Sequence, residues 1–193
     1  MDVNNRKSNI MKTKNLLVLL PVVALTLGGC ATIKEALVVK QDVSFTISMP
    51  VTVNEPLLKS SAAVINASKT FDPAEDEAVQ SLIDRIQGFS MNSLTIVVTG
   101  ISDAPVTLTN ANLAISAEVN GETLSVNIPM NGTYNNGDSK TISDDDFATL
   151  EQMLDALVPV TTTLTGNTDK SPVSFTLETT LDTQVSIGIF GGE

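Results

Sequence analysis

Apolar and polar residues alternate along several segments of this chain, and this alternation constrains the fold more than any other sequence feature. Between residues 43 and 53, every odd position holds Val, Phe, Ile or Met, and every even position holds Ser, Thr or Pro. A period of two places successive side chains on opposite faces of a β-strand, so the segment predicts a strand with one buried face. Pro50 lies on the other face and indicates an edge strand, a bulge or a switch between sheets.

A β-hairpin is predicted around Asn120-Gly121, the residue pair that two-residue type I′ turns prefer. If Val119 pairs with Glu122, the apolar residues of both strands fall on one face. The facing pairs are then Ala117 with Leu124, Ile115 with Val126, and Leu113 with Ile128. Turn chemistry and hydrophobic pattern therefore indicate the same register.

Further strands are predicted at about 60–69, 93–100, 105–109 and 159–165, where Val and Thr are abundant. Near the end of the chain, apolar residues and Thr179 occupy odd positions from Val173 to Leu181, and Val185, Ile187 and Ile189 continue in phase. We therefore expect a mainly β fold, an antiparallel β-sandwich with one solvated face on each sheet.

Two short amphipathic helices are predicted in the connections. The first spans 72–88, with Asp72 as N-cap, Pro73 at the first helical position, Glu75 completing a capping-box-like start and Gly88 as terminator. Its apolar stripe consists of Val79, Leu82, Ile83 and Ile86. The second begins at a Ser143 cap and ends before Pro159, with a stripe of Phe147, Leu150, Met153, Leu154 and Leu157.

The first 29 residues differ from the remainder. An apolar segment at 16–27 is shorter than the roughly twenty residues of a membrane-spanning helix, and Pro21 interrupts it. A basic head precedes it, consisting of Arg6, Lys7, Lys12 and Lys14. A basic head, a short apolar run and small residues at its end are typical of an export signal.

The end of this leader, Leu27-Gly28-Gly29-Cys30, resembles the lipobox of bacterial lipoprotein signal peptides. The resemblance implies cleavage before Cys30, diacylation of its sulfur and acylation of the new amino group. Two or more acyl chains anchor a protein stably, whereas one binds a membrane only marginally. In proteobacterial lipoproteins, an Asp directly after the lipidated cysteine favours retention in the inner membrane. This chain has Ala31 there, so the resemblance implies that the protein resides in the outer membrane. The alternative is a cleaved secretory signal followed by an incidental free cysteine.

These features divide the chain into three parts. Residues 1–29 are the expected lipoprotein signal peptide, residues 30–40 the lipidated N-terminus and tether, and residues 41–193 a single β-sandwich domain. Without the leader's four basic residues and Asp2, seven basic and twenty-one acidic residues remain, a formal charge of −14. Such a charge repels nucleic acid, so we expect no nucleic-acid partner.

The residue types that are absent restrict the chemistry further. The sequence has no His and no Trp, and it has one Tyr and one Cys. A Ser-His-Asp triad and a histidine metal site are therefore excluded, and an acylated Cys30 leaves no thiol nucleophile, thiolate ligand or disulfide. We expect no catalytic residues, no metal and no cofactor.

Three polar segments are candidates for a calcium site or a partner contact. One acidic cluster consists of Asp72, Glu75, Asp76 and Glu77, and another of Asp138, Asp144, Asp145 and Asp146. Neither has EF-hand spacing, and we favour complementation of helix dipoles over calcium binding for both. Residues 135–140 predict a turn that joins a strand to the second helix; alternatively, an exposed Tyr134 beside them contacts a partner.

The strand, the short helix and the segment SLTIVVTGISDAPVTLTNANLAIS at 93–116 resemble small lipoproteins of Bacteroidota. This resemblance implies an immunoglobulin-like sandwich and carries no functional residues. The leading functional hypothesis is a non-catalytic outer-membrane lipoprotein, a binding or structural module attached to the membrane through acyl chains on Cys30, with an envelope protein or glycan as partner. The alternative is a periplasmic carrier of a lipid or hydrophobic ligand; an enzyme using an Asp/Glu pair ranks third.

Overall fold

The computed structural model of the chain describes residues 38–54, 62–142 and 147–189. Contacts divide the chain into two units, Met1–Val38 and Val39–Glu193. Only Val38 of the first unit is among the described residues, so the architecture below is that of the second. The first strand already begins at Val38, so the last three residues of the expected tether belong to a strand.

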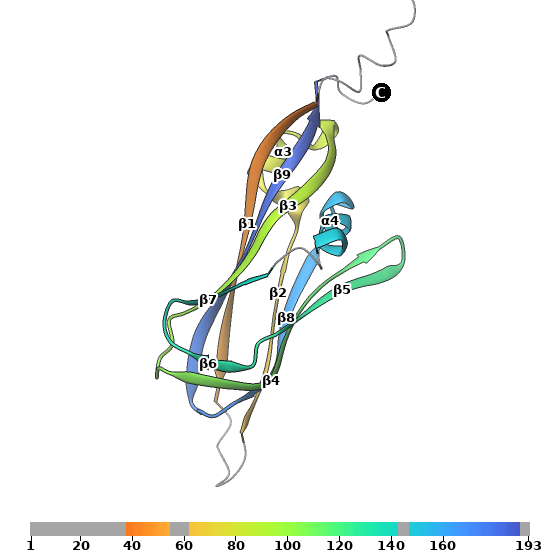
Figure 1. The fold of residues 1–193 in the computed structure, drawn as a ribbon. Helices are drawn as coiled ribbons and strands as arrows, with labels where there is room; N and C mark the ends of the chain where they lie inside the picture. The colour runs from red at the N-terminus through yellow and green to blue at the C-terminus, as the bar shows by residue number, and fades with distance from the viewer. Residues whose placement is uncertain (1–37, 55–61, 143–146, 190–193) are drawn as a thin grey trace, which may run out of the picture. The chain divides into compact units, whose positions relative to one another are not determined.

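The described residues form two antiparallel sheets, which confirms the predicted mainly β sandwich (Figure 1). The first sheet has the order β1 (Val38–Val53), β9 (Val173–Gly188), β3 (Ile86–Thr99) and β7 (Asp138–Ile142). The second has the order β2 (Ala63–Phe71), β8 (Val160–Thr168), β4 (Val106–Val119) and β5 (Glu122–Pro129), and β6 (Gly132–Tyr134) also pairs with β4. Pro50 therefore lies in an edge strand, one of the three predicted settings.

The core lies between the inner faces of the two sheets. In β1, burial alternates from Val43 to Val53 in the predicted phase, and in β9 every odd position from Val173 to Ile187 is buried. Large side chains such as Leu94, Leu113 and Ile115 are fully buried. Burial of each such side chain contributes about 1.5–3 kcal/mol, so this packing dominates the stability of the fold.

The predicted hairpin is confirmed in every pair. Val119 pairs with Glu122, Ile115 with Val126, and Leu113 with Ile128. Asn120 and Gly121 have φ angles of 54° and 84°, the positive values that a type I′ turn requires. The local turn chemistry was therefore sufficient to predict this register.

Bulges interrupt β3 and β4, an inner strand of each sheet. The pairing of β3 with β9 shifts between Met91 and Ser93, and the pairing of β4 with β8 shifts between Thr109 and Asn112. The apolar alternation changes phase at both places, from odd to even positions in β3 and from even to odd in β4. The two strands predicted at 105–109 and 113–119 are consequently one strand, β4, with a bulge inside it.

The helix predicted at 72–88 is wrong in length. Its residues form three short pieces: the 3-10 helix η1 (Pro73–Glu75), the helix α3 (Glu77–Gln80) and the 3-10 helix η2 (Ile83–Arg85). Asp72 caps η1 as predicted, but Asp76 caps α3 separately, which interrupts the helix. Ile86 and Gly88 instead pair with β9 in β3, so Gly88 terminates no helix.

Tertiary pairing explains this outcome. Of the expected stripe, Val79 and Leu82 are buried, whereas Ile83 is 40% exposed. Because β3 extends back to Ile86, it forms additional backbone hydrogen bonds with β9, and Phe89 is buried. A helix that continued through Gly88 would lose both of these contributions. Weak helix propensity is readily overridden by such contacts.

The second helix, α4 (Phe147–Asp155), forms within the predicted segment, and its expected cap at Ser143 lies outside the described residues. It ends two residues before Leu157, which was predicted in its stripe but has a φ of 49° and lies beyond the helix. Its apolar stripe is buried and consists of Phe147, Leu150, Met153 and Leu154. The helix contacts β3 of the first sheet and both β4 and β5 of the second (Figure 1). It therefore connects the two sheets along one side of the sandwich.

Two carboxylates attach α4 to a part of β3 that β7 does not pair with. β7 pairs with β3 only between Leu94 and Val98. Nearer the start of β3, the backbone N–H of Phe89 donates to Asp155 Oδ1 at 2.6 Å, and the backbone N–H of Met91 donates to Glu151 Oε1 at 2.7 Å. The helix side chains thus satisfy strand donors at a sheet edge, where unpaired groups invite pairing with another chain.

We expect Asp155→Ala and Glu151→Ala each to lower the free energy of unfolding by about 1 kcal/mol, because each leaves a strand N–H without its acceptor. The exchange of the Phe89 or Met91 amide hydrogen, followed by NMR, should accelerate in the corresponding variant. Gln152→Ala on the same helix is the matched control, since Gln152 is exposed. Unchanged exchange at both amides would show that the carboxylates do not hold the strand edge.

A second prediction concerns Gly166, which lies opposite the β4 bulge. Its φ is 147°, and an added Cβ would lie 2.6 Å from the Cα of Ala111. Because backbone cannot move aside cheaply, Gly166→Ala should lower the free energy of unfolding by about 3 kcal/mol, measured by urea unfolding. Gly137 has a φ of 89° and open space around it, so Gly137→Ala should cost only about 1–2 kcal/mol. Equal costs at the two positions would contradict the close approach.

Candidate functional site

The predicted lipidation site lies outside the described residues. Leu27, Gly28, Gly29 and Cys30 all precede Val38, where the description begins. Their role therefore stays a prediction from the sequence. Among the residues that the structure does describe, no helix combines the length and apolar character needed to cross a bilayer.

The first acidic cluster serves local backbone capping. Asp72 Oδ1 accepts from the Ala74 N–H and Asp76 Oδ1 from the Ala78 N–H, both at 2.9 Å. Of the second cluster, Asp138 begins strand β7 rather than a helix, and Asp144, Asp145 and Asp146 lie outside the described residues. Within 38–54, 62–142 and 147–189, no three or more acidic, His or Cys side chains gather to hold a metal ion.

Tyr134 is half-buried rather than exposed, which contradicts the alternative of an exposed contact residue. It ends strand β6 and packs against the hydrophobic core. The turn after it leads into β7, not directly into a helix, and Asp138 Oδ2 accepts from the Asn135 N–H there. Burial raises the pKa of Tyr134 above its ordinary value of 10.0, and the charge of Asp138 raises it further.

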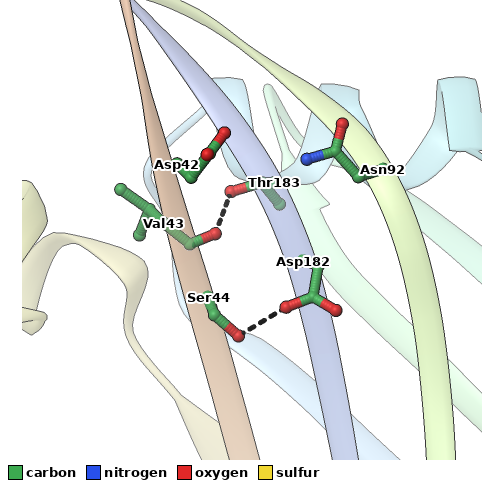
Figure 2. A pocket seen from close by; sticks show the side chains of 6 residues that line it. All are labelled: Asp42, Val43, Ser44, Asn92, Asp182 and Thr183. Carbon is green, nitrogen blue, oxygen red and sulfur yellow. Dashed lines mark hydrogen bonds between the residues drawn. The ribbon is translucent and has the colours of Figure 1, made fainter.

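A depression of about 310 Å³ lies across β1, β9 and β3 of the first sheet (Figure 2). It is shallow and open to solvent. Its lining residues are Asp42, Val43 and Ser44 of β1, Asp182 and Thr183 of β9, and Asn92 of β3. No lysine or arginine lines it, so its electrostatic character is negative.

Asp182 occupies the centre of this depression and organises the strands on either side. Its Oδ1 accepts from the Ser44 hydroxyl at 2.8 Å, and its Oδ2 accepts from the Ser93 hydroxyl at 2.9 Å. The next residue of β9, Thr183, is buried, and its hydroxyl donates to the Val43 carbonyl at 2.8 Å. These bonds join β1, β9 and β3 through side chains, as the dashed lines in Figure 2 show for the β1 side.

Two further groups at the rim have spare hydrogen-bonding capacity. Asp42 Oδ1 accepts from Gln184 Nε2 at 3.2 Å, and its second oxygen has no partner among the residues that the structure describes. Asn92 is the bulged residue of β3, and its exposed amide makes no hydrogen bond within the part of the chain that the structure describes. Figure 2 shows this amide turned toward β9.

This depression was not predicted from the sequence. The signal that was available is the change of phase in SMNSL, where the apolar positions switch from Met91 to Leu94. Such a change indicates a bulge, and bulges often redirect a side chain at a binding site. The partners on β1 and β9 lie too far away in the sequence for any local pattern to associate them.

A second shallow hollow lies between the β4–β5 turn and α4. Its lining includes Val119, Leu124 and Gln152, together with Asp155, which already holds β3. The hollow mixes apolar and acidic groups without a convergent set of free donors. It offers less for recognition than the depression of Figure 2.

Comparison with known proteins identifies no family. No family model matches the chain, and no curated protein matches it. Among solved structures, it is similar to desmodium yellow mottle tymovirus at 10% identity, with 78% of this chain and 92% of the other covered and a TM-score of 0.35. The decameric BFDV capsid protein is 7% identical over 77% of this chain and 98% of its own, with a TM-score of 0.37. At these values the likeness carries no argument about function.

The single tyrosine provides a clean pH prediction, because the chain has no Trp. We expect phenolate absorbance of the folded protein to titrate with a midpoint above 10, and that of the urea-unfolded protein near 10. The contribution of Tyr134 to stability should be complete below the unfolded pKa and lost as pH rises through the folded pKa. Asp138→Asn should lower the folded midpoint only partly, since burial is the larger cause. Identical midpoints in both states would contradict the burial of Tyr134.

Proposed function

We propose that this protein is a non-catalytic lipoprotein of the outer membrane, anchored through acyl chains on Cys30, whose β-sandwich is a binding or structural module of the envelope. The observation that carries the proposal is Leu27-Gly28-Gly29-Cys30 at the end of a basic and apolar leader. A lone cysteine in this position is otherwise unusual in an exported protein.

The arrangement of the described residues is compatible with this role. The compact unit begins at Val39, nine positions after Cys30, so a short tether separates the expected lipid from the folded module. From Asp42 to Thr52, every outward side chain of β1 except Pro50 is Ser, Thr or Asp, which suits a module surrounded by water. Recognition by such a module relies on hydrogen bonds rather than on apolar burial.

The close packing of α4 against the described core argues against a lipid cavity beneath this helix, and so against the carrier hypothesis there. The apolar stripe of α4 contacts the core, and Leu150, Met153 and Leu154 are each 1% exposed. A carrier needs space between helix and sheet for an acyl chain, whereas these side chains occupy that space. We therefore advance only the anchored binding or structural module.

The anchor is tested by Cys30→Ser in the native host, with metabolic labelling by an alkyne fatty acid and fractionation of membranes. We expect the wild-type protein to be labelled and recovered with the outer membrane. The variant should lose the label and accumulate as soluble protein or as uncleaved precursor, because two or more acyl chains are needed for stable anchoring.

Gly28→Ala is the matched control, since it keeps a small residue in the same motif and should retain label and location. Unchanged membrane partitioning of Cys30→Ser would refute the anchor. The carrier hypothesis has its own readout: mass spectrometry of the Cys30→Ser protein would have to detect a co-purifying lipid.

A further inference from the structure

The depression across β1, β9 and β3 combines open acceptors with an unpaired amide. We propose that it binds one neutral sugar ring of an envelope glycan, with Asp42, Asn92 and the hydroxyls around Asp182 as the recognising groups. The inference deepens the proposed function by naming a ligand class for the module. It rests on that function only for the location of the site in the envelope.

Charge selects the class of ligand. Two carboxylates line the depression without a basic side chain, and the chain after the leader carries a formal charge of −14. Phosphate, sulfate and uronic acid groups are therefore repelled. The ligand must be neutral or cationic.

The hydrogen-bonding groups favour a neutral sugar over a cation. Each oxygen of Asp182 already accepts one hydroxyl hydrogen, from Ser44 and from Ser93, and no three or more acidic side chains gather among the described residues to hold a metal ion. The same hydroxyl oxygens still carry lone pairs, the second oxygen of Asp42 is open, and Asn92 offers a donor and an acceptor. Neighbouring sugar hydroxyls both donate and accept, which matches this mixed set.

Size limits the ligand to a single ring. The volume of about 310 Å³ lies at the lower end of the roughly 300–1,000 Å³ typical of small-molecule sites. No aromatic side chain lines the depression, so a sugar would be held by its hydroxyl edge without stacking. We therefore expect millimolar affinity for one ring.

Anchoring compensates for this weak affinity. The twelve chain positions from Cys30 to Asp42 span at most about 40 Å, so the depression stays close to the membrane surface. Many anchored copies facing one polymer raise the overall affinity without any new contact. A repetitive glycan at the membrane surface is the ligand that such a site fits.

The test uses the full chain, labelled with ¹⁵N, in micelles of a detergent without a sugar headgroup. Methyl glycosides of glucose, galactose, mannose and N-acetylglucosamine are added separately, and calcium chloride alone is a further probe. We expect at least one glycoside to shift the Asn92 side-chain amide and the Ser44 backbone amide in a saturable manner. Calcium should shift neither.

Variants assign the binding to the depression. Asn92→Ala and Asp42→Asn should each weaken binding of the effective glycoside by about tenfold, the effect of losing one good hydrogen bond. Both residues are exposed, and the Asn92 amide supports no other residue, so the fold should persist. Asn66→Ala, on the outer face of the second sheet, is the matched control and should leave affinity unchanged.

Three outcomes would overturn the inference: no saturable shift with any glycoside, a response to calcium alone, or equal weakening by Asn66→Ala. Failure of the anchor is distinguishable from failure of the site. Cys30→Ser should bind the single glycoside as the wild type does, whereas only the wild-type protein should attach to lipid vesicles and retain them on glycan-coated beads. Binding to vesicles that bear a neutral glycolipid is then compared with binding to a soluble polysaccharide of the same sugar. The tighter of the two shows whether the sugar comes from a membrane lipid or from a polymer.

Discussion

The packing of two inner sheet faces against each other is the interaction on which the rest of this structure depends. Alternating apolar residues in β1 and β9 present one continuous face to those of β4 and β8, and each large buried side chain contributes about 1.5–3 kcal/mol. A typical hydrogen bond contributes about 1 kcal/mol. Burial therefore decides where local preferences conflict, as it does at Ile86, which joins a strand although the surrounding sequence favours a helix.

The edges of this sandwich are managed by side chains as well as by strands. Where β7 no longer covers β3, Glu151 and Asp155 of α4 accept the hydrogen bonds of Met91 and Phe89. The same helix buries its apolar stripe between the sheets. One nine-residue helix thus closes the side of the core and caps a strand edge, because its two faces differ in chemistry.

The bulge at Asn92 links this architecture to recognition. It occurs next to the strand edge that α4 covers, and it directs an unpaired amide to the outer face beside Asp182. A regular strand would alternate and send one of two neighbouring side chains inward, whereas the bulge lets both Asn92 and Ser93 face outward. The depression lies where the bulge interrupts the pairing of β3 with β9. The bulge is therefore part of the proposed site.

Local chemistry explains how much of this could be predicted. The hairpin at Asn120-Gly121, the buried faces of β1 and β9 and the cap at Asp72 depend on residues close together in the chain, and the sequence by itself determined them. The lipobox stays a prediction from the sequence, because its chemistry depends on a local motif and needs no fold. Only the tertiary structure decided the extension of β3 to Ile86, the attachment of α4 to that strand and the meeting of Asp42, Asn92 and Asp182. Those contacts join residues far apart in the chain, and their free energy arises from burial and pairing that no local pattern encodes.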